Sequence, residues 1–413
     1  MQAAADLDLP FLATDQTWFA ENPYPHFTEA RNAHPWLASS PYGYVLTDYF
    51  AIREVALMQD HFRMPHRRNV ELLGAAGTPW GDFIIDSIQA SPDDKHKRLR
   101  DTLAMAFTPR EANRQRGLMA AVISRLLDEW APKRAFDFEE FASHFPITVF
   151  CGMIGASPDL IPGIRTSMEA IGQGFSLNKD LIPALQDAVV VMQDFVEKLV
   201  AARRRGERLS DERDLLDTLL DAVAGGKIAD EELYNLLIFL FVAGYDTSKN
   251  VLTMNMHLMI ERPEIYRRCG SDKDYCRKVV EETFRYVNPV TSGRMLDREL
   301  EYRGVLFPKD AMIYFPWSMA TRDPRAVENP EEFDPERSQR HSHVGFGLGP
   351  RICLGRYIAL AQIEEGLHLI AQRILNPRRM GPSGWRRFLS TWGLRGLPIA
   401  FDTIEPVGPA SAS

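Results

Sequence analysis

The chain of 413 residues has few cysteines: only Cys151, Cys269, Cys276 and Cys353, with no Cys-x-x-Cys pair among them. So few scattered thiols exclude the disulfide framework of a small secreted domain and favour a reducing cytoplasm. The N-terminal segment MQAAADLDLPFLATDQ contains acidic residues and no Lys or Arg, the wrong charge order for a secretory leader or a membrane anchor. We therefore expect a cytoplasmic protein with no membrane attachment.

Long hydrophobic runs and an excess of positive charge are also missing. The longest strongly apolar segment is Leu236–Tyr245, about half of the ~20 residues that span a bilayer, and it predicts a buried helix. The 48 Lys and Arg residues face 56 Asp and Glu residues, a net charge of −8, and the longest cationic run is Arg203–Arg205. Because phosphate contacts require clustered cations, we expect a small-molecule substrate and no nucleic acid.

The interior contains no repeat, low-complexity tract or Gly/Ser linker that would divide the chain. Helical spacing of apolar residues occurs in Arg98–Phe107, Gly117–Trp130, Leu185–Arg203 and Asp230–Ile260. Strand-like segments occur near Trp36–Thr47, Arg294–Trp317 and Phe388–Phe401. The expected fold class is mainly α with a small β region (α+β). Since that β region draws on distant segments, we expect one domain over residues 1–413, with an unstructured tail at about 404–413.

The most informative segment is the glycine-rich HVGFGLGPRICLG at residues 343–355. Its glycines permit tight turns, and Cys353 stands where a helical pattern begins. Free N–H groups and the dipole at a helix N-terminus stabilise a thiolate, which suits Cys353 to bind a soft metal centre. Taken alone, however, a free cysteine is more often a small buried hydrophobe.

The pattern Phe346-Gly-x-Gly-x-Arg-x-Cys353-x-Gly355 resembles the haem-binding signature of cytochrome P450 enzymes of the soluble bacterial type. The resemblance implies the P450 fold, a triangular helical body that encloses haem b (iron protoporphyrin IX), with small mixed or antiparallel sheets. It makes Cys353 the axial ligand of the haem iron. It also places Phe346, Gly347, Arg351 and Gly355 against the cofactor.

A second block, AGYDTS at residues 243–248, lies inside the predicted Asp230–Ile260 helix. Helical spacing puts Ala243, Gly244 and Thr247 on one face. On its own, a threonine in mid-helix is compatible with simple back-bonding to the preceding turn. The resemblance implies that Ala243 and Gly244 lie over the haem, and that Asp246 as acid and Thr247 as hydroxyl deliver protons to dioxygen.

Charged residues in other segments fit the same family. Glu282 and Arg285 share one face of a predicted helix, where such a pair is more often solvated. The resemblance implies that they form a buried structural network with Arg337.

A further group of basic residues is expected to bind the cofactor. Basic residues such as those near His96 could simply form a solvated helix face. The resemblance instead implies contacts with the haem propionates, because two buried carboxylates need cationic partners. The residues expected to make these contacts are His96, Arg100, Arg294 and Arg351.

The expected substrate contacts are Phe83, Ile84, Phe239, Val242, Ala243, Val290 and Thr291. Because most of these side chains are apolar, they predict a small or medium-sized apolar substrate, such as a terpenoid, alkyl or aromatic compound. Each residue could equally well pack the core.

The resemblance implies a monooxygenase, an oxidoreductase that uses O2 and two externally supplied electrons to hydroxylate a C–H bond. The expected electron donor is a ferredoxin with its reductase, since no flavin or iron–sulfur segment is fused to this chain, and the enzyme is expected to be a monomer. Candidate docking cations are Lys97, Arg98, Arg340, His341 and Arg356, each of which could also be ordinary surface charge.

Two other interpretations remain open at this point. A peroxide-driven haem-thiolate enzyme is disfavoured, because such proteins tend to replace the acid–alcohol pair. A haem-binding protein without oxygenation would have no use for that pair. The identity of the substrate and the position of attack do not follow from these residues.

Overall fold

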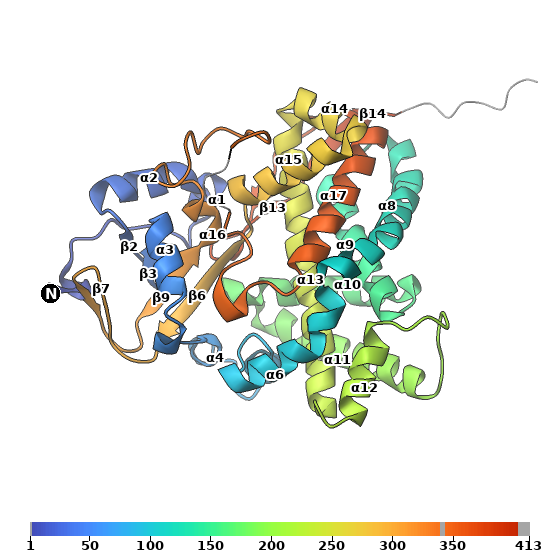
Figure 1. Cartoon of the computed structure of the whole chain (residues 1–413), viewed down its shortest axis with the longest axis horizontal. Helices are drawn as coiled ribbons and strands as arrows, with labels where there is room; N and C mark the ends of the chain where they lie inside the picture. Colours follow the sequence, from blue (N-terminus) through green and yellow to red (C-terminus); the bar gives the residue numbers. More distant parts are fainter. Residues whose placement is uncertain (1, 339–342, 404–413) are drawn as a thin grey trace, which may run out of the picture.

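The computed structural model describes residues 2–338 and 343–403, and it consists of a large helical body with a β-rich region at one side (Figure 1). The α-helices are α1 (Thr17–Glu21), α2 (Pro23–Ala33), α3 (Tyr49–Ala56), α4 (His66–Leu73), α5 (Pro79–Asp86), α6 (Asp93–Leu103), α7 (Pro109–Arg114), α8 (Arg116–Trp130), α9 (Phe138–Ile154), α10 (Ile161–Gly172), α11 (Ile182–Arg204), α12 (Leu215–Ala224), α13 (Asp230–Ile260), α14 (Pro263–Ser271), α15 (Lys273–Tyr286), α16 (Trp317–Ala320) and α17 (Arg356–Arg373).

Strands within the described residues form four small sheets. The strands are β1 (Gln2–Ala3), β2 (Leu37–Ser40), β3 (Gly43–Leu46), β4 (Phe62–Arg63), β5 (Ala135–Asp137), β6 (Val290–Leu296), β7 (Leu300–Tyr302), β8 (Val305–Phe307), β9 (Met312–Pro316), β10 (Leu375–Arg379), β11 (Gly384–Trp385), β12 (Ser390–Thr391), β13 (Leu394–Arg395) and β14 (Pro398–Asp402).

The largest sheet has the order β12-β6-β9-β3-β2, with β4 paired to β6. Its β3–β9 pair is parallel, and its β6–β9 and β2–β3 pairs are antiparallel. Strands from the C-terminal part of the chain join earlier ones, because β12 pairs with β6 and β14 pairs with β5. The predicted fold class, mainly α with small mixed sheets, is confirmed. The predicted tail at 404–413 lies outside the described residues.

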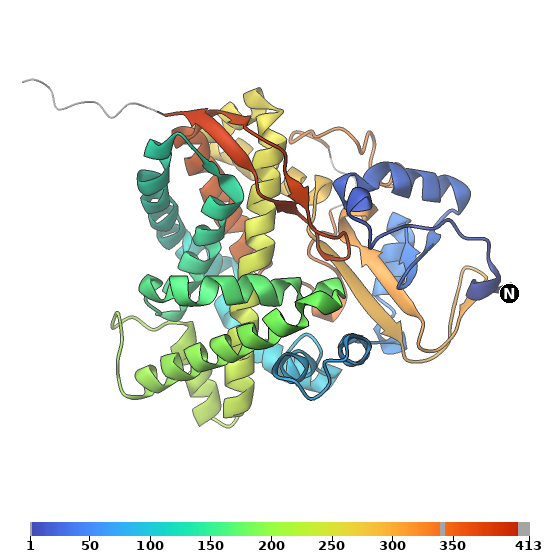
Figure 2. The ribbon, with the colours of Figure 1, turned by 180° about the vertical axis from the view of Figure 1, so that it is seen from behind.

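Helix α13 runs through the middle of the helical body (Figure 1) and has the predicted bounds. Asp230, Glu231 and Glu232 occupy its first turn, where their charges complement the helix dipole. Its apolar residues are buried on nearly all sides, as expected for a helix enclosed by others. Helices α10 and α11 cross it on the face seen in Figure 2. The centre of α13 is therefore reached by side chains from several elements.

Membrane-spanning length and apolarity are not found together in any helix of residues 2–338 and 343–403.

Candidate active site

A cavity of about 1250 Å³ lies between α6, α13, β6 and the loop that precedes α17. Sites for a single drug-sized ligand typically enclose about 300–1,000 Å³, so this cavity has room for a large group and a second molecule. It is lined by all the residues predicted for catalysis, metal ligation, cofactor contact or substrate contact. Segments that lie far apart in the sequence thus supply one site.

Cys353 reaches this cavity from the turn before α17. Its side chain is exposed, whereas the other three cysteines are buried, and the space it faces is the cavity. Its backbone N–H donates to the Phe346 carbonyl at 2.9 Å, which closes the glycine-rich loop. Gly347 and Gly349 adopt left-handed φ values of 76° and 74°, a conformation that L side chains rarely adopt. The predicted position of Cys353, just ahead of a helix N-terminus, is confirmed.

The electrostatic surroundings of the Cys353 thiol have opposing effects. Although the thiol borders the cavity, the protein that encloses the cavity desolvates it and raises the pKa of Cys353, while the Gly355 N–H and the charges of Arg100 and Arg356 act to lower it. Desolvation prevails, so the pKa lies above its ordinary value. Thiolate formation here is therefore expected to depend on a bound cationic metal.

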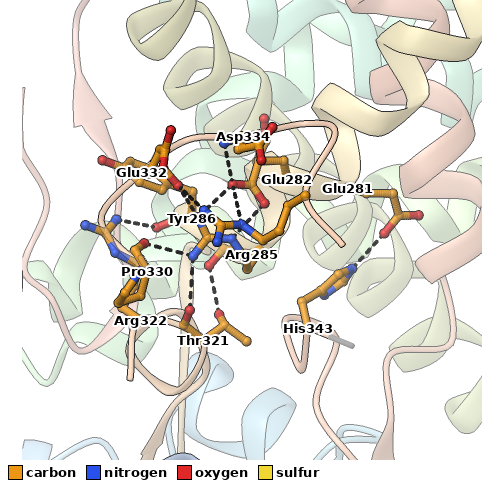
Figure 3. A network of polar contacts seen from close by, with 12 residues as sticks. Glu281, Glu282, Arg285, Tyr286, Thr321, Arg322, Pro330, Glu332, Asp334 and His343 are labelled. Atoms are coloured by element: carbon orange, nitrogen blue, oxygen red, sulfur yellow. Dashed lines mark hydrogen bonds and ion pairs between the residues drawn. The ribbon is translucent and has the colours of Figure 1, made fainter. Parts of the chain in front are cut away.

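Side chains of α15 anchor the front of the same loop. His343 Nε2 lies 2.9 Å from a carboxylate oxygen of Glu281 (Figure 3), and the Phe346 ring lies 4.6 Å from the Phe284 ring. These contacts join the cysteine loop to the helix that also carries the Glu-x-x-Arg pair.

On α13, Ala243 and Gly244 expose their surfaces to the cavity. A Cβ at Gly244 would meet nothing within 4 Å, so the absence of a side chain leaves open space there. Thr247 donates its hydroxyl to the Ala243 carbonyl at 2.8 Å, the back-bonding expected of a threonine in mid-helix. Asp246 is buried, and one carboxylate oxygen accepts from Arg386 at 2.8 Å.

The four predicted cations converge on the cavity. Burial and then the charge of Arg351 lower the pKa of Arg294 to about 10. Burial, with the charges of Arg351 and Arg100, lowers the pKa of His96 to about 4. Arg351 also donates to Asp93 at 2.9 Å and to the carbonyls of Gln89 and Ser91. With its lowered pKa, His96 is neutral at ordinary pH and can donate a hydrogen bond. The three arginines, Arg100, Arg294 and Arg351, form a cation group suited to hold an anionic ligand, and the two carboxylates of haem would fit it.

His66 is a cavity residue that the sequence analysis missed. It is buried at the start of α4, and this burial lowers the pKa of His66 to about 4. A hydrogen bond to Gln89 acts in the opposite direction and raises the pKa, but its effect is smaller. The charges of Arg294 and Arg351 lower that pKa further, which places His66 beside the cation group. Arg294 and Arg351 lie more than 200 positions from His66 in the sequence, and no motif connects the three residues. Only the fold shows that they lie close together.

The Glu282–Arg285 pair is fully buried, with two contacts of 2.7 Å and about 1% exposure of each side chain (Figure 3). Arg285 also donates to three backbone carbonyls, those of Thr321, Pro330 and Glu332. Arg337 lies at the edge of this network, with its Nε 3.7 Å from Glu282. The network ties α15 to the segment that leads into the cysteine loop.

The predicted docking cations differ in what surrounds them. Lys97 pairs with Asp101 at 2.5 Å, and Arg98 pairs with Glu232 at 2.7 Å, so nearby carboxylates offset both charges. Arg356 donates to the Cys353 carbonyl at 3.2 Å. Arg340 and His341 lie outside the described residues.

Comparisons with known proteins agree with one another. A family profile described as Cytochrome P450 matches residues 175–374. The luteothin monooxygenase of Streptomyces thioluteus is 28% identical over 400 residues, 95% of this chain and 96% of the relative. The polyketide biosynthesis cytochrome P450 PksS of Bacillus subtilis (strain 168) is 28% identical over 326 residues, 77% of this chain and 78% of the relative. The crystal structure of CalO2 superimposes with a TM-score of 0.86 at 23% identity, covering 96% of this chain and 100% of CalO2.

Proposed function

This chain belongs to the cytochrome P450 family and is a monooxygenase, and we propose that it hydroxylates a C–H bond of a small or medium-sized apolar organic molecule. One observation carries this proposal: a single cavity is lined by Cys353, by the Asp246/Thr247 pair and by a mainly apolar set of side chains. A thiol, a proton-transfer pair and an apolar pocket are the three features that such a reaction requires.

We propose that the chain holds haem b through Cys353 and the cation group. When bound, haem b supplies the iron that activates dioxygen, and a thiolate ligand favours O–O cleavage. His96, Arg100, Arg294 and Arg351 would bind its carboxylates, and His66 would lie beside them. Phe346, Gly347, Gly355, Ala243 and Gly244 would lie against the macrocycle.

The acid–alcohol pair would supply protons to the cavity. The Thr247 hydroxyl can accept a hydrogen bond while it donates to Ala243, which keeps its oxygen available to the cavity side. Asp246 is the adjacent acid on the same helix. In this proposal Asp246 passes protons to the Thr247 region, and the apolar residues orient the substrate and exclude water.

The substrate would lie against Phe83 and Ile84 of α5, Phe239, Val242 and Ala243 of α13, and Val290 and Thr291 of β6. This mainly apolar lining favours an apolar natural product, and two relatives are named for luteothin and for polyketide biosynthesis. We propose that a ferredoxin and its reductase supply the electrons. We also propose that the enzyme is a cytoplasmic monomer that folds as one domain.

The function is tested with isotopically labelled dioxygen. The purified holoenzyme, NADH, a ferredoxin and its reductase are incubated with a panel of terpenoid, alkyl and aromatic compounds. The proposal expects one labelled oxygen atom in the product of at least one compound. Product formed equally well from unlabelled hydrogen peroxide without redox proteins, and therefore without the dioxygen label, would favour the peroxide-driven alternative. NADH use that yields no oxygenated compound would contradict hydroxylation.

Replacing Thr247 with alanine is expected to separate electron use from product formation. The hydroxyl is lost while the helix is retained, because alanine is the best helix former. General acid–base groups contribute about 10²- to 10⁴-fold to the step they serve, so the product formed per NADH should fall at least about tenfold. Product and hydrogen peroxide are quantified against NADH consumed, and Thr253→Ala, a back-bonded threonine of α13 away from the cavity, is the control. An unchanged coupling ratio would contradict the role of Thr247.

Replacing Arg294 with leucine is expected to weaken haem binding. A hydrogen bond to a charged group contributes about 1.5–3 kcal/mol, so haem should transfer to apomyoglobin about 10- to 100-fold faster. Arg298→Leu is the control, since this arginine follows the same strand but pairs with Asp60 at the surface. Equal transfer rates for the two variants would remove Arg294 from the propionate site.

A further inference from the structure

Helix α4 forms one edge of the cavity, where the β-rich region meets the helical body (Figure 1). Arg67 and Arg68 of this helix line the cavity, and Met295 of β6 and Tyr314 of β9 line it beside Arg68. These four residues form the α4 rim. Arg67 is exposed and Arg68 is half-buried, so the cavity opens to solvent at this rim.

The two arginines of the α4 rim have no carboxylate partners. The Asp310 carboxylate is paired with Arg63. Arg68 instead donates to the Asp310 backbone carbonyl at 3.0 Å and contacts Met295 Sδ at 3.6 Å, and both of these acceptors are neutral. Among residues 2–338 and 343–403, neither Arg67 nor Arg68 forms an ion pair. Two positive charges at the mouth of the cavity are therefore available to a ligand.

The hydrogen-bonding capacity of Arg68 is only partly used. Its Nη1 makes both contacts described above, whereas Nε and Nη2 have no partner in the described part of the chain. A guanidinium group presents its donors in a planar fork that matches the two oxygens of a carboxylate. Because Nη1 holds the side chain at the rim, the free nitrogens are already placed for such a contact.

Tyr314 adds a neutral donor next to Arg68. This residue is only 6% exposed, yet its hydroxyl forms no hydrogen bond with any residue that the structure describes. Burial raises the pKa of Tyr314, and the charge of Arg68 acts to lower it, so the hydroxyl keeps its proton at neutral pH. A Cβ at Gly293 would lie 3.1 Å from Tyr314 Cε1, so the ring packs directly over β6. Buried hydroxyls usually have a partner, and this one is free to bind a ligand.

The start of α4 also favours an anion. Arg67 and Arg68 lie in its first turn, which contains no acidic residue, and Pro65 provides no side-chain cap. Positive side chains at this end oppose the helix dipole, and a bound anion would offset that repulsion.

We propose that the α4 rim binds the carboxylate of the substrate: Arg68 and Tyr314 hold it, and Arg67 attracts it from the surface. The apolar body of the same molecule would extend past Val290 of β6 toward Ala243 of α13. A few placed polar groups that orient an otherwise apolar ligand are typical of small-molecule sites. The inference rests on the proposed function and deepens it, because it names the substrate class as carboxylic acids with an extended apolar body.

The test measures ligand binding to the holoenzyme by isothermal titration calorimetry. The probes are straight-chain acids from octanoic to tetradecanoic acid, below their critical micelle concentrations, each compared with the alcohol of the same length. A hydrogen bond to a charged group strengthens binding about 10- to 100-fold. At least one acid should therefore bind the wild type at least about tenfold more tightly than its alcohol.

Variants of the rim assign this preference to its residues. Arg68→Gln should weaken binding of the acid about 10- to 100-fold and change binding of the alcohol less than about twofold, because the alcohol carries no charge. Tyr314→Phe should weaken binding of the acid about 2- to 10-fold, as expected for one neutral hydrogen bond. Arg67→Gln should have a smaller effect that disappears at high salt, because exposed charges are screened.

Arg110→Gln is the matched control. Arg110 of α7 is exposed, forms no ion pair among the described residues and does not line the cavity. The variant changes the net charge as Arg68→Gln does, and both ligands should bind it as they bind the wild type.

Three results would overturn the proposal. The first is that no acid of the series binds more tightly than its alcohol, and the second is that Arg68→Gln weakens binding of acid and alcohol equally. The third is that Arg68→Gln accelerates haem transfer to apomyoglobin as Arg294→Leu does, which would assign Arg68 to a haem carboxylate. Binding is measured without NADH or redox proteins, so this test can fail while the oxygenation experiment succeeds, and the reverse.

Discussion

Cys353→Ser is expected to abolish NADH-dependent oxygenation while the fold persists. The hydroxyl of serine is a poor ligand for a soft iron centre and does not supply the electron density that a thiolate gives. The side chain lies in open cavity space, so the change removes no packing contact of the core. Product formation should fall to the level of a control without enzyme, and the midpoint of thermal unfolding of the haem-free protein should stay within a few degrees of the wild type.

Cys151→Ala is the matched control for Cys353. Cys151 lies on α9, is buried and does not line the cavity. Burial raises its pKa to about 12, so it is an inert thiol. Its replacement should lower stability slightly and leave turnover unchanged. Product formation by Cys353→Ser at the wild-type rate would contradict the assignment of Cys353 as the metal ligand.

Arg285→Ala is expected to lower the free energy of unfolding by about 3–5 kcal/mol, because it leaves the Glu282 carboxylate buried without its partner. Three backbone carbonyls lose their donor in the same variant. Since these carbonyls belong to the segment before the cysteine loop, haem incorporation during expression should fall as well. The measurements are urea unfolding followed by circular dichroism, and the ratio of haem to protein.

The same spacing at the surface provides a control for Arg285. Glu264 and Arg267 also form an i,i+3 pair, at 2.6 Å, but their side chains are 82% and 62% exposed. Arg267→Ala should change stability by less than about 1 kcal/mol, because solvent screens exposed pairs. If both variants lost similar stability, burial would not be the reason for the effect.

The sequence predicted those features that neighbouring residues determine, such as the ends of a helix or the position of a tight turn. The bounds of α13 were correct because a long apolar run between an acidic first turn and Pro263 leaves little alternative. The position of Cys353 before a helix followed from glycines that only a tight turn accommodates. The strand-like segments predicted one β region built from distant parts of the chain, but only the fold shows which strands pair, such as β12 with β6.

Contacts between residues that are far apart in the sequence could not be predicted from local patterns. Arg386 meets Asp246 although 140 positions separate them, and neither residue's neighbours encode that contact. His66 is buried close to Arg294 and Arg351, and neither hydrophobic periodicity nor a sequence motif predicts that position. Lys97 and Arg98 were predicted as docking cations or ordinary surface charge, but Asp101 on the same helix pairs with Lys97 and Glu232 of α13 pairs with Arg98.

The most direct test of the account is the carbon-monoxide difference spectrum of the reduced wild-type holoenzyme. A cysteine thiolate opposite carbon monoxide shifts the Soret band strongly to the red, so the account predicts that red-shifted band in the wild type and its absence in Cys353→Ser. A wild-type spectrum with the band position typical of imidazole ligation, and unchanged by that substitution, would contradict the role of Cys353 and with it the proposed chemistry.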